Sequence, residues 1–364
     1  MPEPLTLWIN ARFLSRPVSG VERVAREILH VMSNQFLDNN GTLMIDDQPW
    51  KFRLVGPRLG LSSPWDNIPL TEIGRWSGHM WEQTSLAKHT AGQWLLNLCN
   101  TGPLLKRQQL TFLHDAQPFA IPDNFTAAFR LWYRIMYRCH ARFAHRILVN
   151  SHFSASELKK HVGLKTRKVI HCPLGIDHQG RDSPEAPSSP AVKLPSSPFL
   201  LAVSSANPNK NFSGLLKALE TMGTAAPSCV IVGQQHQQQF AAMAIDPAKV
   251  QHMGYVSDQT LMALYRRADA LVFPSFYEGF GLPPLEAMAQ GCPVIVSNAS
   301  AIPEVCGEAA EYCDPSDPQS IASAIYNVCG DANRRKHLSE IGVRHANTFT
   351  WQKAAKALIS ALKT

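Results

Sequence analysis

The apolar positions of this chain fall mostly into short continuous runs, each followed by a loop rich in glycine or polar residues. Short runs without alternation are typical of strands buried on both faces of a parallel sheet, and they are too short for most helices. Strands are predicted at residues 5–9, 111–113, 146–149, 199–203, 229–233 and 271–273.

Helices are predicted between these runs, among them residues 21–32 and 351–362. The alternation of strands and helices predicts an α/β fold with parallel sheets wound by helices, one sheet in each half of the chain. In such sheets ligands gather at the carboxyl ends of the strands. The polar motifs described below all follow strands in this way.

A Pro- and Ser-rich segment divides the two halves. Residues 179–198 contain five Pro and five Ser, so they cannot supply a core and are predicted to be an exposed connector. We therefore expect an N-terminal domain over residues 1–178, a linker over 179–198 and a C-terminal domain over 199–347. A chain of 364 residues agrees with two domains of roughly 150 residues each.

The most informative loop follows the strand at 271–273 and reads P-S-F-Y-E-G-F-G-L-P-P-L-E-A-M-A over residues 274–289. Gly279 and Gly281 permit backbone angles that other residues avoid, and the two prolines suit the first turn of a helix, where N–H groups are unpaired. A helix is expected from about Pro284 to Gly291, with Glu286 in its first turn. The turn would present main-chain N–H groups and two carboxylates, Glu278 and Glu286, to one small volume.

This motif resembles the nucleotide-sugar signature of the family-4 retaining glycosyltransferases, in which two glutamates are separated by seven residues. The resemblance continues through residues 297–298 and 302–305 and covers nearly the whole chain, more weakly before residue 199. It implies the GT-B fold, with two Rossmann-like domains facing an interdomain cleft. It also implies that the last helix, within residues 348–364, packs back on the N-terminal domain.

The resemblance implies a role for each residue of the motif. Glu278 would contact donor-sugar hydroxyls and Glu286 the nucleotide ribose, while Lys210 would neutralise the leaving diphosphate. Main-chain N–H groups that face the sugar and diphosphate would come from Gly279, Phe280, Gly281 and Leu282. Family members usually also carry an arginine after the first strand of this domain or directly before the lysine. Here those places hold Ser204, Ser205 and Asn209. Fewer positive charges are therefore expected around the diphosphate than in most family members.

The N-terminal half adds four candidate residues. Gly20 resembles the family glycine that lets the backbone approach the donor phosphate, and Arg23, which follows it closely, is a candidate for the acceptor side. His114 ends the strand at 111–113, where a family histidine touches the donor sugar, and Asp115 would orient His114 or meet the acceptor. A lone glycine or histidine in such a place is also compatible with a purely structural role.

Arginines recur every four residues from Arg130 to Arg146 beside an apolar face with helical spacing. The row drifts around the helix, so Arg130, Arg134 and Arg138 are expected to be exposed, and Arg142 and Arg146 partly covered. A solvated helix face is the plain interpretation. The alternative is a surface for an anionic membrane that carries a lipid-linked acceptor.

The positive charge of the chain is concentrated in its N-terminal half. Residues 1–175 carry 21 Lys and Arg against 12 Asp and Glu, a net charge of +9, whereas residues 176–364 carry 14 against 16, a net charge of −2. The eight cysteines form no Cys-x-x-Cys pair, which indicates reduced thiols and no metal site. The start has no signal-peptide pattern and no apolar run approaches ~18 residues, so we expect a cytoplasmic protein, peripheral at the inner face of the membrane.

The expected reaction is retaining transfer of a sugar from a nucleotide diphosphate sugar to a hydroxyl of a glycan or lipid-linked acceptor, without a metal, a cofactor or a nucleic-acid partner. The resemblance of the start, I-N-A-R-F-L-S-R-P-V-S-G-V, to polysaccharide and O-antigen mannosyltransferases favours GDP-mannose, followed by UDP- and dTDP-sugars. A sugar-nucleotide 2-epimerase and a noncatalytic nucleotide-sugar-binding subunit stay as alternatives. A dinucleotide oxidoreductase is disfavoured, because no Gly-x-Gly-x-x-Gly motif with its acidic partner is present.

Overall fold

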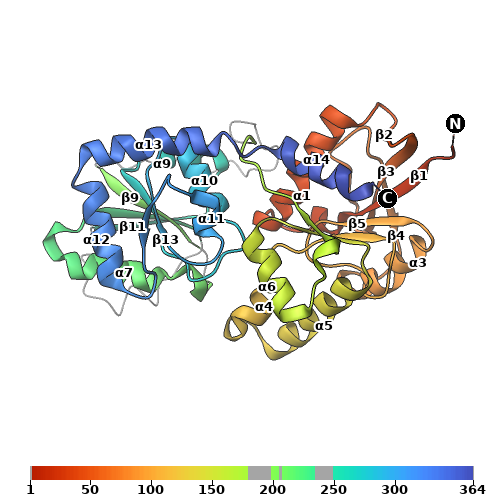
Figure 1. Ribbon diagram of the computed structural model, residues 1–364, viewed down its shortest axis with the longest axis horizontal. Coiled ribbons are helices and arrows are strands. Elements are labelled where there is room, and N and C mark those ends of the chain that lie inside the picture. Colours follow the sequence, from red (N-terminus) through yellow and green to blue (C-terminus); the bar gives the residue numbers. More distant parts are fainter. Residues whose placement is uncertain (1, 179–197, 205–206, 234–248, 364) are drawn as a thin grey trace. The chain divides into compact units, whose positions relative to one another are not determined.

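The computed structural model describes residues 2–178, 198–204, 207–233 and 249–363. It divides into two compact units, unit 1 with residues 1–175 and 350–364, and unit 2 with residues 176–349 (Figure 1). Almost all of the connector expected at 179–198 lies outside the described residues, and the division between the units falls at residues 175 and 176.

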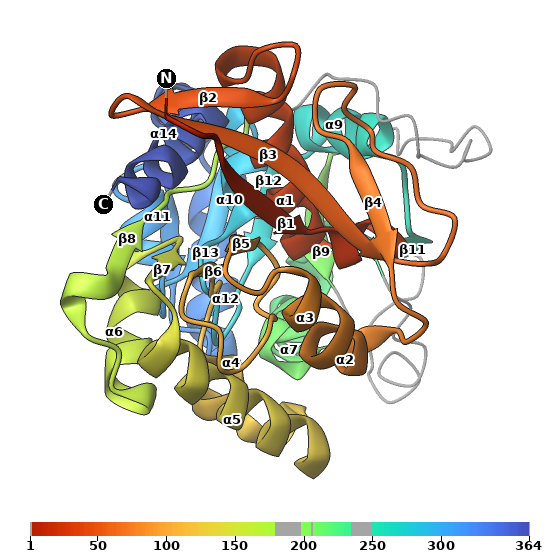
Figure 2. The same ribbon diagram turned by 90° about the vertical axis from the view of Figure 1, so that its right-hand side faces the viewer.

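Unit 1 is built on an eight-stranded sheet whose strands follow the order β2-β3-β1-β5-β6-β7-β8, with β4 beside β3 (Figure 2). The pairs from β1 to β8 are parallel, and β1 lies between β3 and β5. The strands of the described part of unit 1 are β1 (Leu5–Asn10), β2 (Thr42–Ile45), β3 (Gln48–Pro57), β4 (Leu70–Ile73), β5 (Trp94–Asn97), β6 (Gln109–Phe112), β7 (Arg146–Val149) and β8 (Val169–His171).

One pair departs from the expected parallel sheet. β2 runs antiparallel to β3, with Thr42 opposite Lys51 and Ile45 opposite Gln48. The two residues between the strands, Asp46 and Asp47, have φ of 47° and 62°, as a two-residue hairpin turn requires. The prediction of a wholly parallel sheet is therefore wrong at this edge, because Asp-Asp is a weaker hairpin signal than Asn-Gly or Asp-Gly.

The helices of unit 1 follow the strands closely in the sequence. The segment 78–89 is nearly continuous, since a π-helical stretch at Glu82–Leu86 joins α2 to α3. Trp81, inside this segment, is fully buried. Trp50 and Trp65 are also buried, whereas Trp76 is exposed. The helices are α1 (Gly20–Val31), α2 (Gly78–Trp81), α3 (Ala87–His89), α4 (Gln117–Ala120), α5 (Ala127–Phe143), α6 (His152–Val162) and α14 (Trp351–Leu362).

Unit 2 is built on a six-stranded parallel sheet with the order β11-β10-β9-β12-β13-β14. Strand order reverses between β9 and β12, so the loops after these two strands separate and leave room at the carboxyl edge of the sheet. Its strands are β9 (Phe199–Ser204), β10 (Ser228–Gly233), β11 (Val250–Gly254), β12 (Ala270–Phe273), β13 (Val294–Ser297) and β14 (Glu311–Cys313).

Helices cover both faces of this sheet. α7 and α12 pack together on one face, where their apolar residues form a core with Leu200, Ile231 and Val272. α10 packs against α9 and α13. The described helices of unit 2 are α7 (Phe212–Met222), α9 (Asp258–Arg267), α10 (Leu282–Ala289), α11 (Ile302–Cys306), α12 (Pro318–Cys329) and α13 (Ala332–Ala346).

The last helix, α14, belongs to unit 1 although the chain reaches it from unit 2 (Figure 1). It contacts α1 and β8, and its apolar side, including Trp351 and Leu358, is fully buried. The approach is close at Gly175, where an added Cβ would lie 2.1 Å from the backbone nitrogen of Trp351. Unit 1 is thus completed by the end of the chain.

Two further expectations concern cysteines and membrane spans. All eight cysteines are free thiols in the structure. Among the described residues, every helix is too short or too polar to cross a bilayer.

Truncating Leu358 to Ala tests the contribution of α14 to unit 1. Leu358 is fully buried, so Leu358→Ala should lower the free energy of unfolding of unit 1 by about 2–5 kcal/mol through lost contacts and a cavity. Lys356→Ala, at an exposed position of the same helix, should change it by less than about 0.5 kcal/mol. Urea unfolding of both variants measures the difference, and equal midpoints would contradict the packing of α14.

Candidate functional site

An ion pair stands where the strand order of unit 2 reverses. Lys210 follows β9 and Glu278 follows β12, and these strands are neighbours in the sheet. The Nζ of Lys210 lies 2.8 Å from Oε1 of Glu278, and the two side chains are 23% and 11% exposed. Nζ also lies 5.0 Å from the centroid of the Phe273 ring, within cation–π distance. Two residues 68 positions apart thus present opposite charges at one point.

Asn209 fixes the loop that carries Glu278. Its side-chain Nδ2 donates to the backbone carbonyl of Tyr277 at 2.8 Å, and its backbone carbonyl accepts from the N–H of Phe276 at 2.7 Å. Asn209 is buried, so these bonds are shielded from water. From the sequence, position 209 was notable only because it lacks the arginine of many family members. In the structure its amide holds the loop that carries Glu278.

Ser300 holds Glu278 from the other side. The N–H of Glu278 donates to Oγ of Ser300 at 2.9 Å, and Ser300 itself has a φ of 58°. A non-glycine residue in this region of backbone space is uncommon and often marks a functional turn. Ser300 lay in the stretch after β13 but carried no sequence signal of this role.

The glycine turn before α10 is constrained by both its backbone and its neighbours. Gly281 has a φ of 124°, and a Cβ there would lie 2.8 Å from Cδ1 of Ile302, so only glycine fits. The side chain of Phe280 is buried, with its ring 6.0 Å from that of Phe349. Phe280 therefore has only main-chain atoms to offer a ligand.

The start of α10 corrects one prediction. The helix begins at Leu282 rather than near Pro284, because Gly281 serves as its N-cap and the prolines occupy its second and third positions. Glu286 is therefore the fifth residue of the helix and not part of its first turn. Since Pro283 and Pro284 lack N–H groups, fewer donors are available at this helix end than at most.

Glu286 is surrounded by two aromatic residues of unit 2. The hydroxyl of Tyr265 lies 3.4 Å from its Oε2, and Nε2 of His178 lies 3.5 Å from its Oε1. His178 is buried, at 7% exposure. The sequence analysis assigned residue 178 to the N-terminal domain, whereas the structure includes it in unit 2, so its proximity to Glu286 was missed.

The remaining candidates belong to unit 1. His114 follows β6 and is buried, with its ring stacked on Phe112 at 4.3 Å between centroids. Its Nε2–H donates to the carbonyl of Leu98 at 2.8 Å, and its backbone N–H donates to Oδ1 of Asn100, also at 2.8 Å. Burial lowers the pKa of His114 to about 4, so the ring is neutral near pH 7.

Asp115 and Gly20 both lie at helix starts. Oδ1 of Asp115 accepts from the N–H of Gln117 at 2.9 Å at the beginning of α4, while His114 is oriented by Leu98. Gly20 is the first residue of α1, and a Cβ there would meet no atom within 4 Å. The backbone at Gly20 is thus open to an approaching group. Arg23 is in the first turn of the same helix and is half-buried.

A buried polar network in unit 1 was not predicted at all. Glu82 is fully buried, and its Oε2 lies 2.7 Å from Nη1 of Arg12 and 3.0 Å from Nδ1 of His79. Its Oε1 accepts from Asn10 at 3.1 Å and from Thr101 at 2.6 Å. Burial alone would raise the pKa of Glu82, but the bond from His79 and the charge of Arg12 hold it below its ordinary value. No local motif joins these residues in the sequence.

The arginine row on α5 is covered differently from the expectation. Arg130 and Arg134, both expected to be exposed, are half-buried. α4 packs against α5, and the Nε of Arg134 donates to the carbonyl of Pro118 at 3.0 Å. Arg142, expected to be partly covered, is exposed, while Arg138 is exposed and Arg146 half-buried as expected. Helix phase alone did not reveal the cover that α4 provides.

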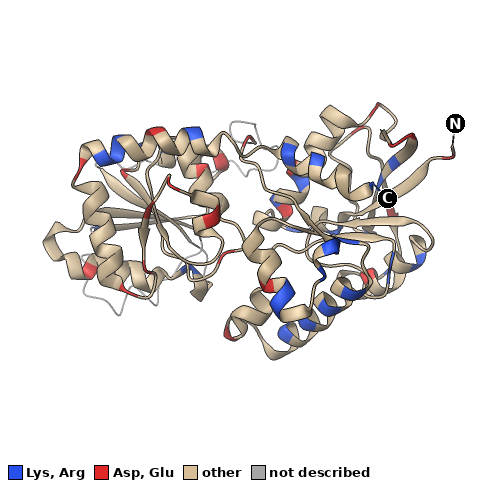
Figure 3. Cartoon of the chain, viewed as in Figure 1, with Lys and Arg blue, Asp and Glu red and all other residues tan. Residues whose placement is uncertain are grey.

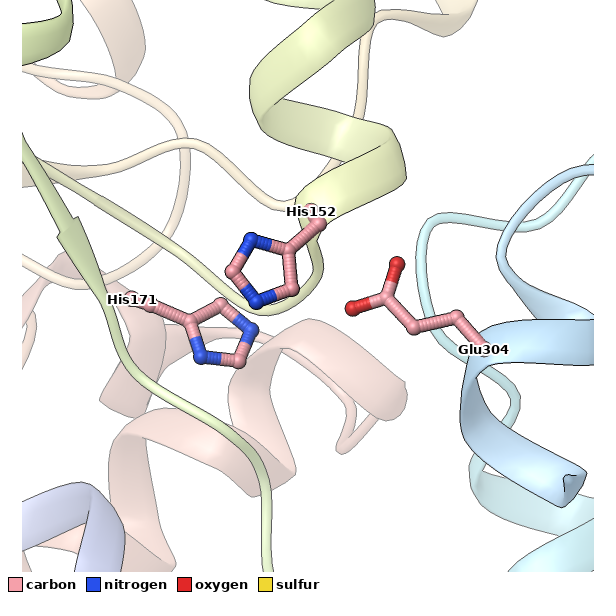
Figure 4. A group of neighbouring side chains, drawn as sticks. All are labelled: His152, His171 and Glu304. Atoms are coloured by element: carbon pink, nitrogen blue, oxygen red, sulfur yellow. The ribbon is translucent and has the colours of Figure 1, made fainter.

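Two histidines of unit 1, His152 and His171, lie close enough to be considered as metal ligands. The rings of His152 and His171 stack with centroids 4.3 Å apart (Figure 4). Glu304, drawn in the same figure, is a residue of unit 2. Two imidazoles fall short of the four ligands of a structural zinc site, so we assign no metal to them.

Comparison with known proteins adds the family context. Residues 188–345 match the model of the family described as glycosyl transferases group 1. The chain is 31% identical over 233 residues to the O-antigen chain mannosyltransferase B of Escherichia coli, covering 60% of each protein. It is 30% identical over 233 residues to the O-antigen chain mannosyltransferase RfbU of Salmonella typhimurium, covering 63% of each. The matches thus span less than two thirds of these relatives.

Solved structures resemble the chain over almost its entire length. Alr3699/HepE from Anabaena, in complex with UDP and glucose, aligns with a TM-score of 0.70 and 16% identity over 99% of each chain. WaaG, a glycosyltransferase involved in lipopolysaccharide biosynthesis, aligns with a TM-score of 0.69 and 14% identity over 99% of this chain and 100% of its own. These likenesses confirm the predicted GT-B fold with two Rossmann-like domains.

The buried neutral His114 predicts a dependence of stability on pH. Its pKa is about 4 in the folded protein and about 6.5 in an unfolded chain. As pH falls from 6.5 to 4, the unfolded state binds a proton that the folded state does not, so stability should fall by about 3 kcal/mol.

Replacing the ring measures this contribution. His114→Asn, which keeps a donor for Leu98, should show a shallower loss of unfolding free energy between pH 6.5 and 4 than the parent protein. Urea unfolding at several pH values provides the two slopes. Identical slopes would show that His114 titrates normally in the folded state.

Proposed function

We propose that the protein transfers a glycosyl group from a nucleotide diphosphate sugar to an acceptor hydroxyl, because residues 188–345 match the glycosyl transferases group 1 family and the chain has the GT-B fold. One observation carries the proposal: Lys210 and Glu278 meet at 2.8 Å where the strand order of unit 2 reverses. Open parallel sheets bind ligands at such a point. The pair offers one cation for phosphate and one acceptor for sugar hydroxyls.

The two members of the pair act on different parts of the donor. A diphosphate carries more negative charge than one carboxylate, so it would draw Lys210 away from Glu278. Glu278 is then able to accept hydrogen bonds from sugar hydroxyls. Lys210 is 23% exposed and Glu278 only 11%, so a ligand that draws Lys210 away must itself donate hydrogen bonds to Glu278.

Transfer follows a front-face route with retained anomeric configuration. As the bond between the anomeric carbon and the phosphate oxygen breaks, negative charge grows on the diphosphate, and Lys210 and the N–H groups around Gly281 stabilise that charge. The departing phosphate oxygen accepts the proton of the acceptor hydroxyl, which bonds to the anomeric carbon on the same face. The positive charge at the diphosphate comes from the protein, so the proposed reaction needs no metal or other cofactor.

Glu286 completes the donor site by binding the ribose. Its two carboxylate oxygens are oriented by Tyr265 and His178 at 3.4 and 3.5 Å. A carboxylate held in this way is able to accept from two adjacent ribose hydroxyls. His114 of unit 1 is neutral near pH 7, so its proposed role toward a sugar is hydrogen bonding and not an ion pair.

The curated relatives suggest the sugar and the setting. Two of them are named O-antigen chain mannosyltransferases, so we propose mannose as the sugar and GDP-mannose as the first donor to test. The acceptor would be a glycan or lipid-linked saccharide of cell-surface polysaccharide synthesis, reached at the cytoplasmic face of the membrane by unit 1.

Single substitutions at the ion pair test the reaction. Lys210→Met and Glu278→Gln should each lower turnover of GDP-mannose by about 10²–10³, because each removes one group that stabilises the transition state. GDP release without acceptor, and mannose transfer with isolated membranes, measure the effect. Chelation of divalent ions with EDTA should leave the rate of the parent protein unchanged.

The control for these variants lies on α7. Lys217 is exposed, and Lys217→Met should retain full turnover while losing the same charge. Tight binding of GDP-mannose in a thermal-shift assay without turnover on any membrane acceptor would favour a noncatalytic subunit instead. Normal turnover in both Lys210→Met and Glu278→Gln would contradict the proposed site.

We also propose that α5 brings unit 1 to an anionic membrane surface. Arginines recur along this helix (blue in Figure 3), and the apolar Leu131 and Ile135 are 64% and 40% exposed on it. Exposed apolar groups beside cations are typical of helices that lie in the membrane interface. Arg138 is exposed, and its guanidinium carbon lies 5.5 Å from the centroid of the Phe119 ring.

Charge reversal tests this surface. Replacing Arg130, Arg134 and Arg138 by Glu should weaken sedimentation with anionic lipid vesicles on the order of 100-fold, since each basic group near such a surface contributes about 1 kcal/mol. The matched control reverses Lys217, Lys336 and Lys356, which are exposed elsewhere. Equal losses in the two triple variants would show a general charge effect and not a surface on α5.

A further inference from the structure

The amino edge of the unit 1 sheet carries charges of one sign where four strands begin. β5, β6, β7 and β8 are consecutive parallel neighbours (Figure 2), so the segments that lead into them meet at one edge. Residues 87–93, 103–108, 141–146 and 165–168 form these segments and contain eight Lys and Arg but no Asp or Glu. None of the eight forms an ion pair with a carboxylate of the described residues. This part of the amino edge is therefore a basic surface.

Two lysines fix these segments in place. Nζ of Lys168 donates to the carbonyls of Arg142 and Ala144 at 2.7 and 2.8 Å, which ties the segment before β8 to the end of α5. Nζ of Lys106 donates to the carbonyl of Thr90 at 2.6 Å. Carbonyl groups satisfy hydrogen bonds of these ammonium groups but do not cancel their charge, so the surface stays positive.

The cations around Lys168 repel one another. Burial lowers the pKa of Lys168, and four neighbouring cations lower it further. These are Arg167, Lys165, Arg142 and Arg146. Like charges gathered in this way destabilise the folded unit through repulsion, whereas a bound group of negative charge would remove that cost. The arrangement therefore indicates an anionic occupant.

An apolar groove of about 940 Å³ opens at the same edge. The loop 103–108 forms part of its lining, so Lys106 and Arg107 join the groove to the basic surface. Met80 and Leu105, also of the lining, are 59% and 72% exposed. Exposed apolar side chains around a concave surface are typical of a binding site, and the volume admits several apolar side chains.

The composition of this surface favours a protein as the occupant. Met, Trp and Arg are enriched where proteins bind one another, and the groove combines Met80, Trp132 and Arg107. An amphipathic helix is able to place its apolar side chains in such a groove. Acidic residues on the same helix would then meet the cations beside the groove.

The place of this surface separates it from the proposed reaction. Ligands of an open parallel sheet bind at the carboxyl ends of its strands, where His114 and Asp115 follow β6. The basic surface and the groove stand at the opposite, amino ends of the same strands. An occupant here is therefore neither the donor nor the acceptor of the transfer.

We infer that the amino edge of β5 to β8 binds an acidic, amphipathic helix of a partner protein, with its apolar side in the groove and its carboxylates on the cations of residues 106–107 and 165–168. The inference goes beyond the proposed glycosyl transfer and does not depend on it. It involves no residue of the proposed donor site.

The test measures binding of a fluorescein-labelled designed peptide to the full chain by fluorescence anisotropy. The peptide has about 18 residues, with Leu at i, i+3, i+4 and i+7 on one side and Glu and Ala elsewhere. It should bind saturably. A peptide with Lys in place of Glu, and one of the same composition with the Leu order scrambled, should each bind at least about tenfold more weakly. Absence of saturable binding, or equal binding of the scrambled peptide, would overturn the inference.

Filling the groove tests its apolar part. Ala91 is exposed and belongs to the lining, so Ala91→Trp fills the groove without disturbing the core and should weaken peptide binding at least about tenfold. Ala128→Trp, at an exposed alanine of α5 outside the lining, should leave binding unchanged. Equal affinities of these two variants would overturn the role of the groove.

Charge reversal tests the basic part. Replacing Arg107, Lys165 and Arg167, which are all exposed, by Glu should weaken peptide binding at least about tenfold. The control reverses three exposed lysines elsewhere in the chain, Lys217, Lys336 and Lys356. Equal losses in the two triple variants would overturn the assignment to the amino edge, because binding would then follow net charge alone.

Vesicles distinguish a protein partner from a lipid surface. Sedimentation with phosphatidylglycerol vesicles should change by less than about twofold when Arg107, Lys165 and Arg167 are reversed. A loss as large as that for the peptide would assign the surface to lipid and overturn the inference. Turnover of GDP-mannose should be equal in the parent protein and in Ala91→Trp, so failure of the proposed transfer and failure of this inference are distinguishable.

Discussion

The ion pair between Lys210 and Glu278 is the contact on which the donor side of this protein depends. It forms because two adjacent parallel strands, β9 and β12, end at the same edge of the sheet and their loops turn apart there. Asn209 and Ser300 then fix the backbone of the Glu278 loop from two sides. The order of the strands thus brings Lys210 and Glu278 to the same edge of the sheet, and the loop contacts fix the distance between them.

A second ion pair, Arg12 with Glu82, stands at the corresponding edge of unit 1 but differs in burial. Lys210 and Glu278 are 23% and 11% exposed, whereas Arg12 and Glu82 are 6% and 0% exposed. Removing one member of a buried pair typically costs about 3–5 kcal/mol, while a pair that retains contact with water is worth about 1 kcal/mol or less. Lys210 is therefore able to exchange its partner for a ligand, whereas Arg12 and Glu82 hold each other inside unit 1.

Sequence reasoning predicted the elements of the sheets and the segment of the Glu278 loop because these depend on local patterns. Short apolar runs identified β7 and β12, and the glycines followed by two prolines located the turn before α10. The same local rules placed the start of α10 too late, since they did not weigh Gly281 as a cap. The network around Glu82 was missed, because Asn10, His79 and Thr101 meet only through the order of the strands.

The absence of an arginine before Lys210 now has a structural reason. The side chain of Asn209 is short enough to stay buried and to reach the Tyr277 carbonyl at 2.8 Å. A longer cationic side chain at this position would have to leave that contact, because a buried charge needs an acceptor of opposite sign. Position 209 thus serves the geometry of the Glu278 loop, and neutralisation of the diphosphate falls to Lys210 and the main-chain donors of the glycine turn. Two prolines reduce the number of those donors, and no arginine stands beside Lys210. The charge of Lys210 therefore carries most of the proposed stabilisation of the leaving diphosphate.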